Sequence, residues 1–379
     1  MAHPSVEHLT HLISIKSVTR DTAAATAIYD YVVSQLADVP VYITREEYDG
    51  FPSLIVTTRE TKAPKLWLSA HVDVVPAPEQ LFTPREEAGK LYGRGAYDMK
   101  FAVAYYLTLL QELGEQCPEY DLGLMLTADE EIGGFAGTGA LLSRGGYGGE
   151  IAFVPDGGGP FRPMRHAKGM YMVKVIVSGV AAHSSRPWLG HSATGDLVRF
   201  LSAVQSELDA LIAHDDPEHW HPTYNIGLIG GGQAPNQVAD HAEATIDIRY
   251  PDQDSKCMIR DKLVKIAAQY PQVALEVLFD ESDHGVAPED PHLAPYFAAL
   301  RIECGQTEPE WDRAHGTSDA RFFFAAGCRI VIDRPAGGDI HADGEWLDLE
   351  SFHTHYRVLR RYVDAVARLD APTDARTAN

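Results

Sequence analysis

An α/β layer fold is the architecture that this 379-residue sequence predicts, and three observations support it. Helical and strand-like patterns alternate from the start of the chain to about residue 157, which is typical of a mainly parallel sheet covered by helices. Four short runs are apolar throughout and bounded by turn residues, as strands buried on both faces are. After the Gly-rich turn at 157–159 the pattern changes, which indicates an inserted domain of another type.

The first layer begins with two helices and continues into buried strands. Residues 6–18 are amphipathic and residues 22–36 are rich in alanine, so both ranges are predicted to be helical. The four apolar runs, predicted to be strands, are 65–70, 122–127, 150–155 and 329–333. The helices that complete this layer are predicted at 101–113, 291–302 and 347–369.

The insert is expected to span residues 168–282. Residues 171–177 alternate like a half-buried strand, two more strands surround Gly230–Gly232, and a fourth covers 273–279. Helices are predicted at 192–211 and 256–269. A four-stranded, mainly antiparallel sheet with two helices on one face, a ferredoxin-like arrangement, accounts for these elements. Residues 1–167 and 283–379 then form one discontinuous domain.

Composition excludes several classes of partner. With 54 acidic and 32 basic residues the net charge is −22, which repels nucleic acids and anionic membranes. No apolar run approaches the roughly 20 residues that a membrane span needs.

The four cysteines are scattered without a C-x-x-C pair, so we expect them to be reduced. The first residues lack the basic start and apolar stretch of a secretory signal, which favours a cytoplasmic location.

Two histidines and three carboxylates stand where predicted strands or Gly-rich turns end. In open α/β sheets, sites lie at the carboxyl ends of strands. Imidazoles and carboxylates are the ligand types of hydrolytic zinc. The complete set favours a site for two metal ions, with the ligands His71, Asp98, Glu131, Asp156 and His341.

Each of these positions also has a structural interpretation. Asp73 follows His71 by two residues and can orient its imidazole, but a surface pair has the same pattern. Asp98 precedes a predicted helix, where an aspartate is often an N-cap. Asp129, Glu130 and Glu131 are equally consistent with a solvated acidic turn, although three adjacent carboxylates are better explained where cations neutralise them. Two adjacent glutamates can also have different roles, in which one binds metal and the other takes a proton from metal-bound water.

Six segments resemble, in this order, the motifs of the M20 family of metallopeptidases and deacylases. They are residues 69–76, 93–100, 127–133, 182–190, 316–321 and 341–346. The resemblance implies that Asp98 bridges two zinc ions. It also implies that His71 and Asp156 complete one set of ligands, and that Glu131 and His341 complete the other.

The resemblance also implies the catalytic roles. Glu130 is the general base, Asp73 orients the metal-binding histidine, and the peptide bond Asp98–Met99 is cis. The insert corresponds to the family's lid, which also forms the interface of a homodimer. His183 then reaches the neighbouring subunit's site and supports the oxyanion, whereas without the resemblance it is only a surface histidine.

Three further residues are predicted to contact substrate. Asn236 and Arg249 match lid positions that touch substrate in the family, and Arg321 matches a position that receives a substrate carboxylate. Arg249 is equally well placed to pair with Asp247 on the same strand face.

The predicted activity is metal-dependent hydrolysis of a small amide. The substrate is an N-acyl amino acid, a dipeptide or a C-terminal amino acid, and the cation is zinc, with cobalt and manganese as alternatives. Two other functions are a non-catalytic binding protein with this fold and a di-zinc aminopeptidase that holds a free α-amine. Ser192 in place of the family's asparagine and Phe101 in place of glycine leave every ligand in place, but they prevent transfer of a relative's substrate.

Overall fold

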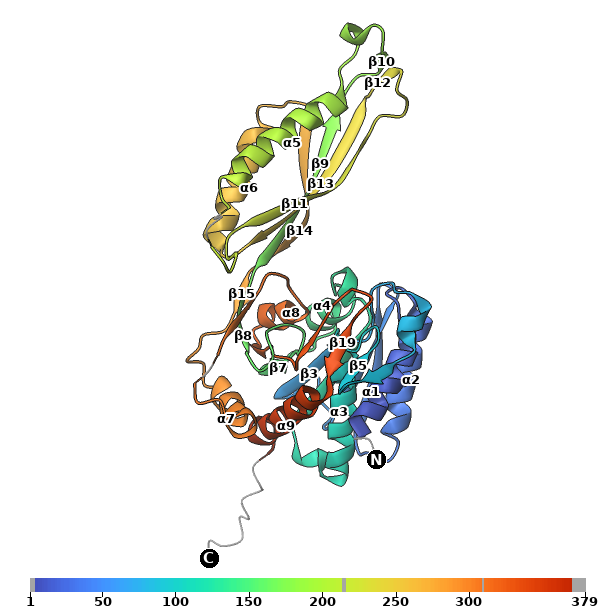
Figure 1. Ribbon diagram of the computed structural model, residues 1–379, viewed down its shortest axis with the longest axis vertical. Coiled ribbons are helices and arrows are strands. Elements are labelled where there is room, and N and C mark those ends of the chain that lie inside the picture. The colour runs from blue at the N-terminus through green and yellow to red at the C-terminus, as the bar shows by residue number, and fades with distance from the viewer. Residues whose placement is uncertain (1–3, 213–215, 309, 370–379) are drawn as a thin grey trace, which may run out of the picture. The chain divides into compact units, whose positions relative to one another are not determined.

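The computed structural model describes residues 4–212, 216–308 and 310–369, which form two compact units (Figure 1). The larger unit comprises the described parts of 1–165, 285–313 and 318–379. The inserted unit comprises His166–His284 and Ala314–Thr317, against a predicted range of 168–282. Residues 314–317 belong to the inserted unit although they lie far downstream of it in the sequence, and no sequence pattern predicted this. Residues 1–3 and 370–379 of the predicted discontinuous domain lie outside the described residues.

The larger unit is built on a six-stranded mixed sheet in the order β1-β2-β6-β3-β7-β17. Strands β6, β3, β7 and β17 run parallel, whereas β1 and β2 are antiparallel to their neighbours. All four predicted strands are confirmed, and the β1–β2 hairpin adds an antiparallel edge. The bounds are β1 (Tyr42–Tyr48), β2 (Phe51–Thr57), β3 (Leu66–His71), β6 (Leu122–Thr127), β7 (Ile151–Phe153) and β17 (Arg329–Val331).

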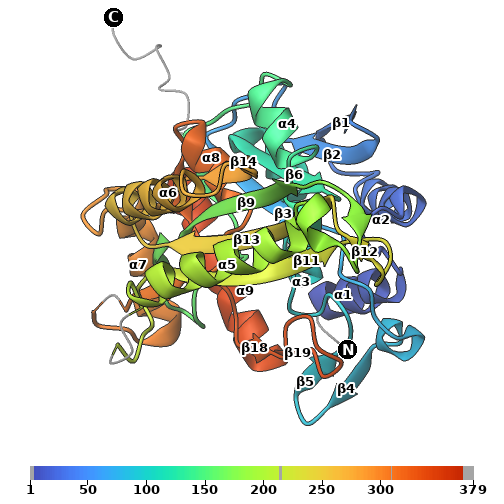
Figure 2. The ribbon, with the colours of Figure 1, turned by 90° about the horizontal axis from the view of Figure 1, so that it is seen from above.

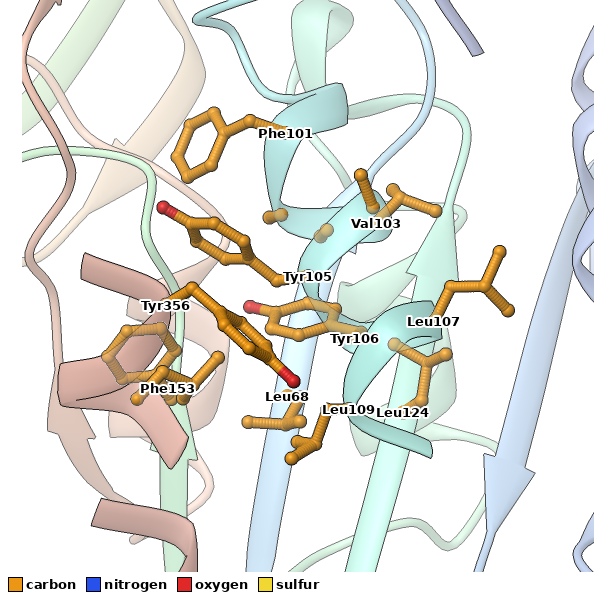
Figure 3. Close-up of a cluster of buried hydrophobic side chains, with 14 of the residues drawn as sticks. Leu68, Phe101, Val103, Tyr105, Tyr106, Leu107, Leu109, Leu124, Phe153 and Tyr356 are labelled. Atoms are coloured by element: carbon orange, nitrogen blue, oxygen red, sulfur yellow. The ribbon is translucent and has the colours of Figure 1, made fainter. Parts of the chain in front are cut away.

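Helix α3 (Lys100–Leu113) lies at the centre of the core. Nearly all of its residues are buried, as expected for a helix that is apolar on every side. Figure 3 shows Tyr105 and Tyr106 of α3 among Leu68, Leu124 and Tyr356, which come from two strands and a second helix. The other helices of this unit are α1 (Pro4–Ser14), α2 (Thr22–Gln35), α4 (Thr138–Ser143), α7 (Leu293–Cys304), α8 (Ala320–Ala325) and α9 (Leu349–Val366), of which only the short α4 and α8 were not predicted.

A second small sheet of the larger unit joins segments that are remote in sequence. Its order is β18-β19-β5-β4, with β4 (Arg85–Glu87), β5 (Lys90–Tyr92), β18 (Gly337–Gly338) and β19 (Trp346–Asp348). Trp346 pairs with Tyr92, which brings the segment that contains His341 next to the turn that contains Asp98. Short 3₁₀ turns of this unit are Glu79–Phe82, Gly114–Glu119 and η3 (Glu130–Ile132).

The inserted unit has an antiparallel sheet in the order β11-β13-β9-β14. Helices α5 (Ala193–Asp209) and α6 (Gln253–Ala267) cover one face, and one apolar core includes side chains of both (Figures 1 and 2). This is the arrangement predicted for the insert. The strands are β9 (Gly169–Ser178), β11 (Thr223–Gly231), β13 (His241–Tyr250) and β14 (Val273–Glu281), with a separate antiparallel pair of β10 (Ala182–His183) and β12 (Gln237–Val238) and a turn η4 (Pro187–Leu189).

A three-stranded sheet of β15 (His284–Gly285), β8 (Met164–Ala167) and β16 (Asp312–Ala314) lies where the chain passes from one unit to the other. The four cysteines are free, as predicted. Within the described residues, no helix combines the length and the apolar character that crossing a membrane requires.

Asp333, two residues beyond β17, is a fully buried carboxyl group. It accepts hydrogen bonds from Tyr296 Oη at 2.7 Å and from the Arg334 backbone N–H at 2.8 Å. Burial raises its pKa from 3.8 to about 8, although both hydrogen bonds oppose the shift. Between these pH values the folded chain keeps a proton that the unfolded chain has lost, so the free energy of unfolding falls by about 1 kcal/mol per pH unit as the pH rises.

Asp333→Asn stays neutral at every pH and should therefore gain stability relative to the original chain as the pH rises. We expect the difference in Tm between the two proteins to grow in favour of the variant from pH 5 to pH 8 and to be constant only below about pH 3. Thermal melts in EDTA measure this without a contribution from metal binding. A Tm difference that does not change with pH would contradict a protonated Asp333.

Candidate metal centre and active site

Three of the predicted site segments follow adjacent parallel strands. His71 is the last residue of β3, Glu130 and Glu131 begin η3 after β6, and Asp156 follows β7. Because β6, β3 and β7 are neighbours in the sheet, their carboxyl ends bring these side chains to one edge. The strand pattern alone therefore accounts for three of the five proposed ligands and for the proposed base.

Asp98 lies between two imidazoles. Its Oδ1 is 3.1 Å from His71 Nε2, and its Oδ2 is 3.1 Å from His341 Nε2. Met99 is the N-cap residue of α3, so Asp98 is not the cap that its position before a helix suggested. The Asp98–Met99 peptide bond is cis, as the family resemblance implied.

The remaining predicted ligands gather around this carboxylate. His341 Nε2 is also 3.1 Å from Glu131 Oε2. Two groups have one donor atom from each member within 4.8 Å of the others: His71 with Asp98 and Glu131, and His71 with Glu130 and Asp156. The structure thus brings together all five predicted ligands and the predicted base.

Asp73 supports both the histidine and the glutamates. The ring Nδ1 of His71 lies 3.0 Å from the Asp73 carbonyl oxygen and 3.5 Å from its Oδ1, so Nδ1–H donates and Nε2 faces the other ligands. The Asp73 carboxylate also accepts the backbone N–H groups of Glu130 and Glu131 at 3.3 Å. Thr19 donates its hydroxyl to Asp73 at 2.9 Å, a contact that sequence reasoning missed because nothing in the sequence links residues 54 apart.

The carboxylates of the site crowd one another. Burial, with the charge of Asp98 as the next cause, raises the pKa of Glu131 to about 7 and that of Asp156 to about 6. Burial also raises the pKa of Glu130 well above its ordinary value, with Asp156 as the next cause. Burial would raise the pKa of Asp98 too, but hydrogen bonds from His341 and His71 outweigh it and lower that pKa. Cations would relieve this excess of negative charge.

The donor set fits divalent cations of the zinc type. Two imidazole nitrogens and several carboxylate oxygens are the ligands that zinc, cobalt and manganese accept. Glu131 Oε1 is buried and has no hydrogen-bond partner within the part of the chain that the structure describes. A buried carboxylate oxygen without a donor is explained by a cation that it would bind.

Arg321 is buried, and its guanidinium contacts backbone oxygens of the larger unit. Nη1 donates to the Ser318 carbonyl at 3.0 Å, and Nη2 donates to the Gly133 carbonyl at 2.5 Å. The guanidinium also lies 4.2 Å from the ring centroid of Phe322. These contacts tie the start of α8 to the loop that follows Glu131, and a contact of Arg321 with a substrate carboxylate stays a prediction.

The other three predicted residues belong to the inserted unit. His183 is exposed, and its Nδ1 accepts the Ser185 N–H at 3.2 Å, so the neutral ring carries its proton on Nε2. Asn236 directly precedes β12, the strand that pairs with β10, and its carbonyl accepts the Ser184 N–H. Arg249 makes two hydrogen bonds to Asp247, at 2.9 and 3.1 Å, which is the alternative that the sequence left open. The roles of these residues in catalysis stay predictions.

Comparison with known proteins assigns the chain to a family. Residues 67–365, which contain every proposed ligand, match peptidase family M20/M25/M40. A probable carboxypeptidase of Arthroderma benhamiae is 26% identical over 360 residues, covering 84% of this chain and 77% of that protein. A succinyl-diaminopimelate desuccinylase of Paracoccus denitrificans is 27% identical over 374 residues, covering 93% and 96%.

A solved structure has the same mixed α/β fold. An M20 family metallo-carboxypeptidase of Sulfolobus solfataricus superposes with a TM-score of 0.75 at 16% identity, over 96% of this chain and 99% of that one. The chain therefore belongs to peptidase family M20/M25/M40 and is a metal-dependent hydrolase of amide bonds.

Proposed function

We propose that this chain hydrolyses the amide bond of an N-acyl amino acid, a dipeptide or a C-terminal amino acid, with two zinc ions as cofactors. The position of Asp98 between the two imidazoles carries the proposal. One carboxylate that faces two histidines is suited to hold two cations through a shared ligand. His71 and Asp156 would complete one ligand set, and Glu131 and His341 the other.

Divalent cations at such a site supply Lewis acidity, which lowers the pKa of water and polarises an amide carbonyl. Glu130 is the general base, because its Oε2 lies only 3.9 Å from His71 Nε2 and its side chain is largely buried. Burial raises its pKa, so the carboxylate can hold the proton of the attacking water near neutral pH. Glu130 then passes this proton to the nitrogen of the departing amine.

A panel of N-acyl amino acids, dipeptides and N-blocked peptides tests the proposed function. The purified protein loaded with zinc, cobalt or manganese should release amine from at least one member that has a free carboxylate beside the scissile amide. Chelation should stop the reaction, and added metal should restore it. Release of the N-terminal residue from peptides whose C-terminal carboxylate is amidated, with no cleavage of any N-blocked member, would indicate an aminopeptidase instead. Failure to release amine from any member with any of the three metals would contradict the proposal.

We infer further that the inserted unit forms a homodimer. Strand β11 is an edge strand of its sheet, and Leu228 and Ile229 on it are 69% and 66% exposed. An exposed edge with large apolar side chains is suited to pairing with a second copy. The exposed His183 of one subunit would then complete the site of the other.

Mixing two inactive variants tests this exchange of residues. His183→Ala leaves the base intact, and Glu130→Gln leaves His183 intact, so a heterodimer of the two has one complete site. After subunit exchange of equal amounts, half of the dimers are mixed, and activity should return to about a quarter of the original. Native mass spectrometry confirms that mixed dimers form. Mixed dimers without recovered activity would show that His183 does not act across the interface.

A further inference from the structure

A buried ion pair joins two distant segments next to the proposed ligands. Arg94 is 2% exposed and Glu345 is 1% exposed, and Arg94 Nη1 lies 2.6 Å from Glu345 Oε2. The two residues are 251 positions apart. A buried ion pair contributes little net stability, because both charges lose their hydration. Stability alone is therefore a weak explanation for it, and its neighbours indicate another role.

The second oxygen of Glu345 holds the backbone of Asp98. Its Oε1 accepts the backbone N–H of Tyr97 at 2.9 Å and that of Asp98 at 3.1 Å. Arg94 is itself anchored, because its backbone N–H donates to the Leu81 carbonyl at 2.9 Å. Glu345 therefore fixes the main chain of the residue whose side chain lies between the two imidazoles.

Glu345 is also the end of the segment that contains His341. Its carbonyl accepts the Gly93 N–H at 3.1 Å, next to the pairing of Trp346 with Tyr92. His341 has a left-handed backbone conformation, with φ of 61°, which is unfavourable for a residue with a side chain. Its side chain is 50% exposed, so little packing holds it. The anchoring of Glu345 therefore constrains where His341 lies.

We propose that Arg94 and Glu345 are positioning residues that hold Asp98 and His341 at the mutual placement that the cations require. This inference rests on the proposed function. Both side chains are buried and therefore inaccessible to substrate, so their loss should act on metal affinity and kcat and leave KM unchanged. Partners behind metal ligands are typically worth about 10- to 100-fold in metal affinity.

Two double variants isolate the hydrogen bonds from the charges. Arg94→Met with Glu345→Gln removes both charges but keeps an oxygen for the N–H groups of Tyr97 and Asp98. Arg94→Met with Glu345→Leu removes both charges and that oxygen. The Gln variant should bind Co²⁺ within about threefold of the original affinity, whereas the Leu variant should bind at least about 10-fold more weakly. The Leu variant should also have a lower kcat, an unchanged KM and an altered visible spectrum of the bound Co²⁺.

Equal Co²⁺ affinity in the two folded double variants would overturn the proposal. Glu345→Asp is a second variant for the case in which the Leu variant does not fold, because it keeps the charge for Arg94 but withdraws the carboxylate by one methylene. It should also bind Co²⁺ about 10-fold more weakly, and an affinity like the original would overturn the proposal. Circular dichroism of each metal-free variant reports its fold.

A matched control is the exposed ion pair of Arg85 and Glu87 on the neighbouring strand β4. Arg85→Met with Glu87→Gln should leave Co²⁺ affinity and spectrum unchanged. Because the readout is metal binding, the failure of this proposal is distinct from failure of the proposed function. A protein that binds Co²⁺ but cleaves no amide would contradict only the latter, and the comparison of affinities would still decide the former.

Discussion

Glu130→Gln is expected to lower kcat by at least about 10³-fold while the protein keeps its full complement of metal. Glutamine has the shape of glutamate but cannot accept a proton from water at neutral pH. The five proposed ligands, of which Asp98 is one, do not include Glu130, so metal binding should not need its charge. The measurement combines steady-state kinetics on the best substrate of the panel with elemental analysis of the dialysed protein.

The same experiment separates two roles that the geometry allows for Glu130. This residue also lies within ligand distance of His71 and Asp156, as a third member of their group. If Glu130 binds metal, Glu130→Gln should lose one ion per chain together with activity. If it is the base, activity alone should fall. Glu115→Gln, at an exposed position, is the control and should behave like the original protein. Full turnover in Glu130→Gln would remove the residue from the mechanism.

Local patterns predicted the parts of the site that follow buried strands. The apolar runs before His71, Glu130 and Asp156 form β3, β6 and β7, and their parallel order brings these residues to one edge. Apolar periodicity predicts such elements well because burial of a strand leaves a local signature. The role of Asp98 was less certain from the residues alone, since an aspartate before a helix is usually a cap, and the family motif was needed to favour metal binding.

Contacts between remote segments could not be predicted in this way. The strands β5 and β19 are three residues long, too short for a periodic signal, yet they bring Glu345 to the turn of Asp98. Arg321 was assigned to substrate from its motif, and its buried contact with the Gly133 carbonyl depends on the fold of two separate loops. The buried ion pair of Arg94 and Glu345 had only two signals in the sequence. These were an arginine in the Gly-rich turn 93–95 and an acid four residues after His341.

The second large effect that we expect is on metal content, and it follows from the role of Asp98 as a ligand shared by both cations. Asp98 has one oxygen toward each histidine, whereas Asp156 and Glu131 each belong to one of the two proposed ligand sets. Asp98→Ala should therefore abolish tight binding of both cations, and Asp156→Ala or Glu131→Ala should leave about one ion per chain. Loss of a hydrogen-bond partner behind a metal ligand typically weakens metal affinity by about 10- to 100-fold. Removal of the shared ligand itself should therefore weaken metal affinity by more than that.

Elemental analysis after dialysis and titration with Co²⁺ measure these contents for the three variants side by side. The pattern of ions lost matters more than the loss of activity, because all three variants should be nearly inactive. If Asp98→Ala keeps one ion at the original affinity, Asp98 serves a single cation, and the assignment of a bridging role is wrong. If all three variants lose both ions, the two sites bind metal as one cooperative unit, and the ligand sets cannot be separated by substitution. A retained ion in Asp156→Ala and Glu131→Ala, together with none in Asp98→Ala, requires a single carboxylate to hold both cations.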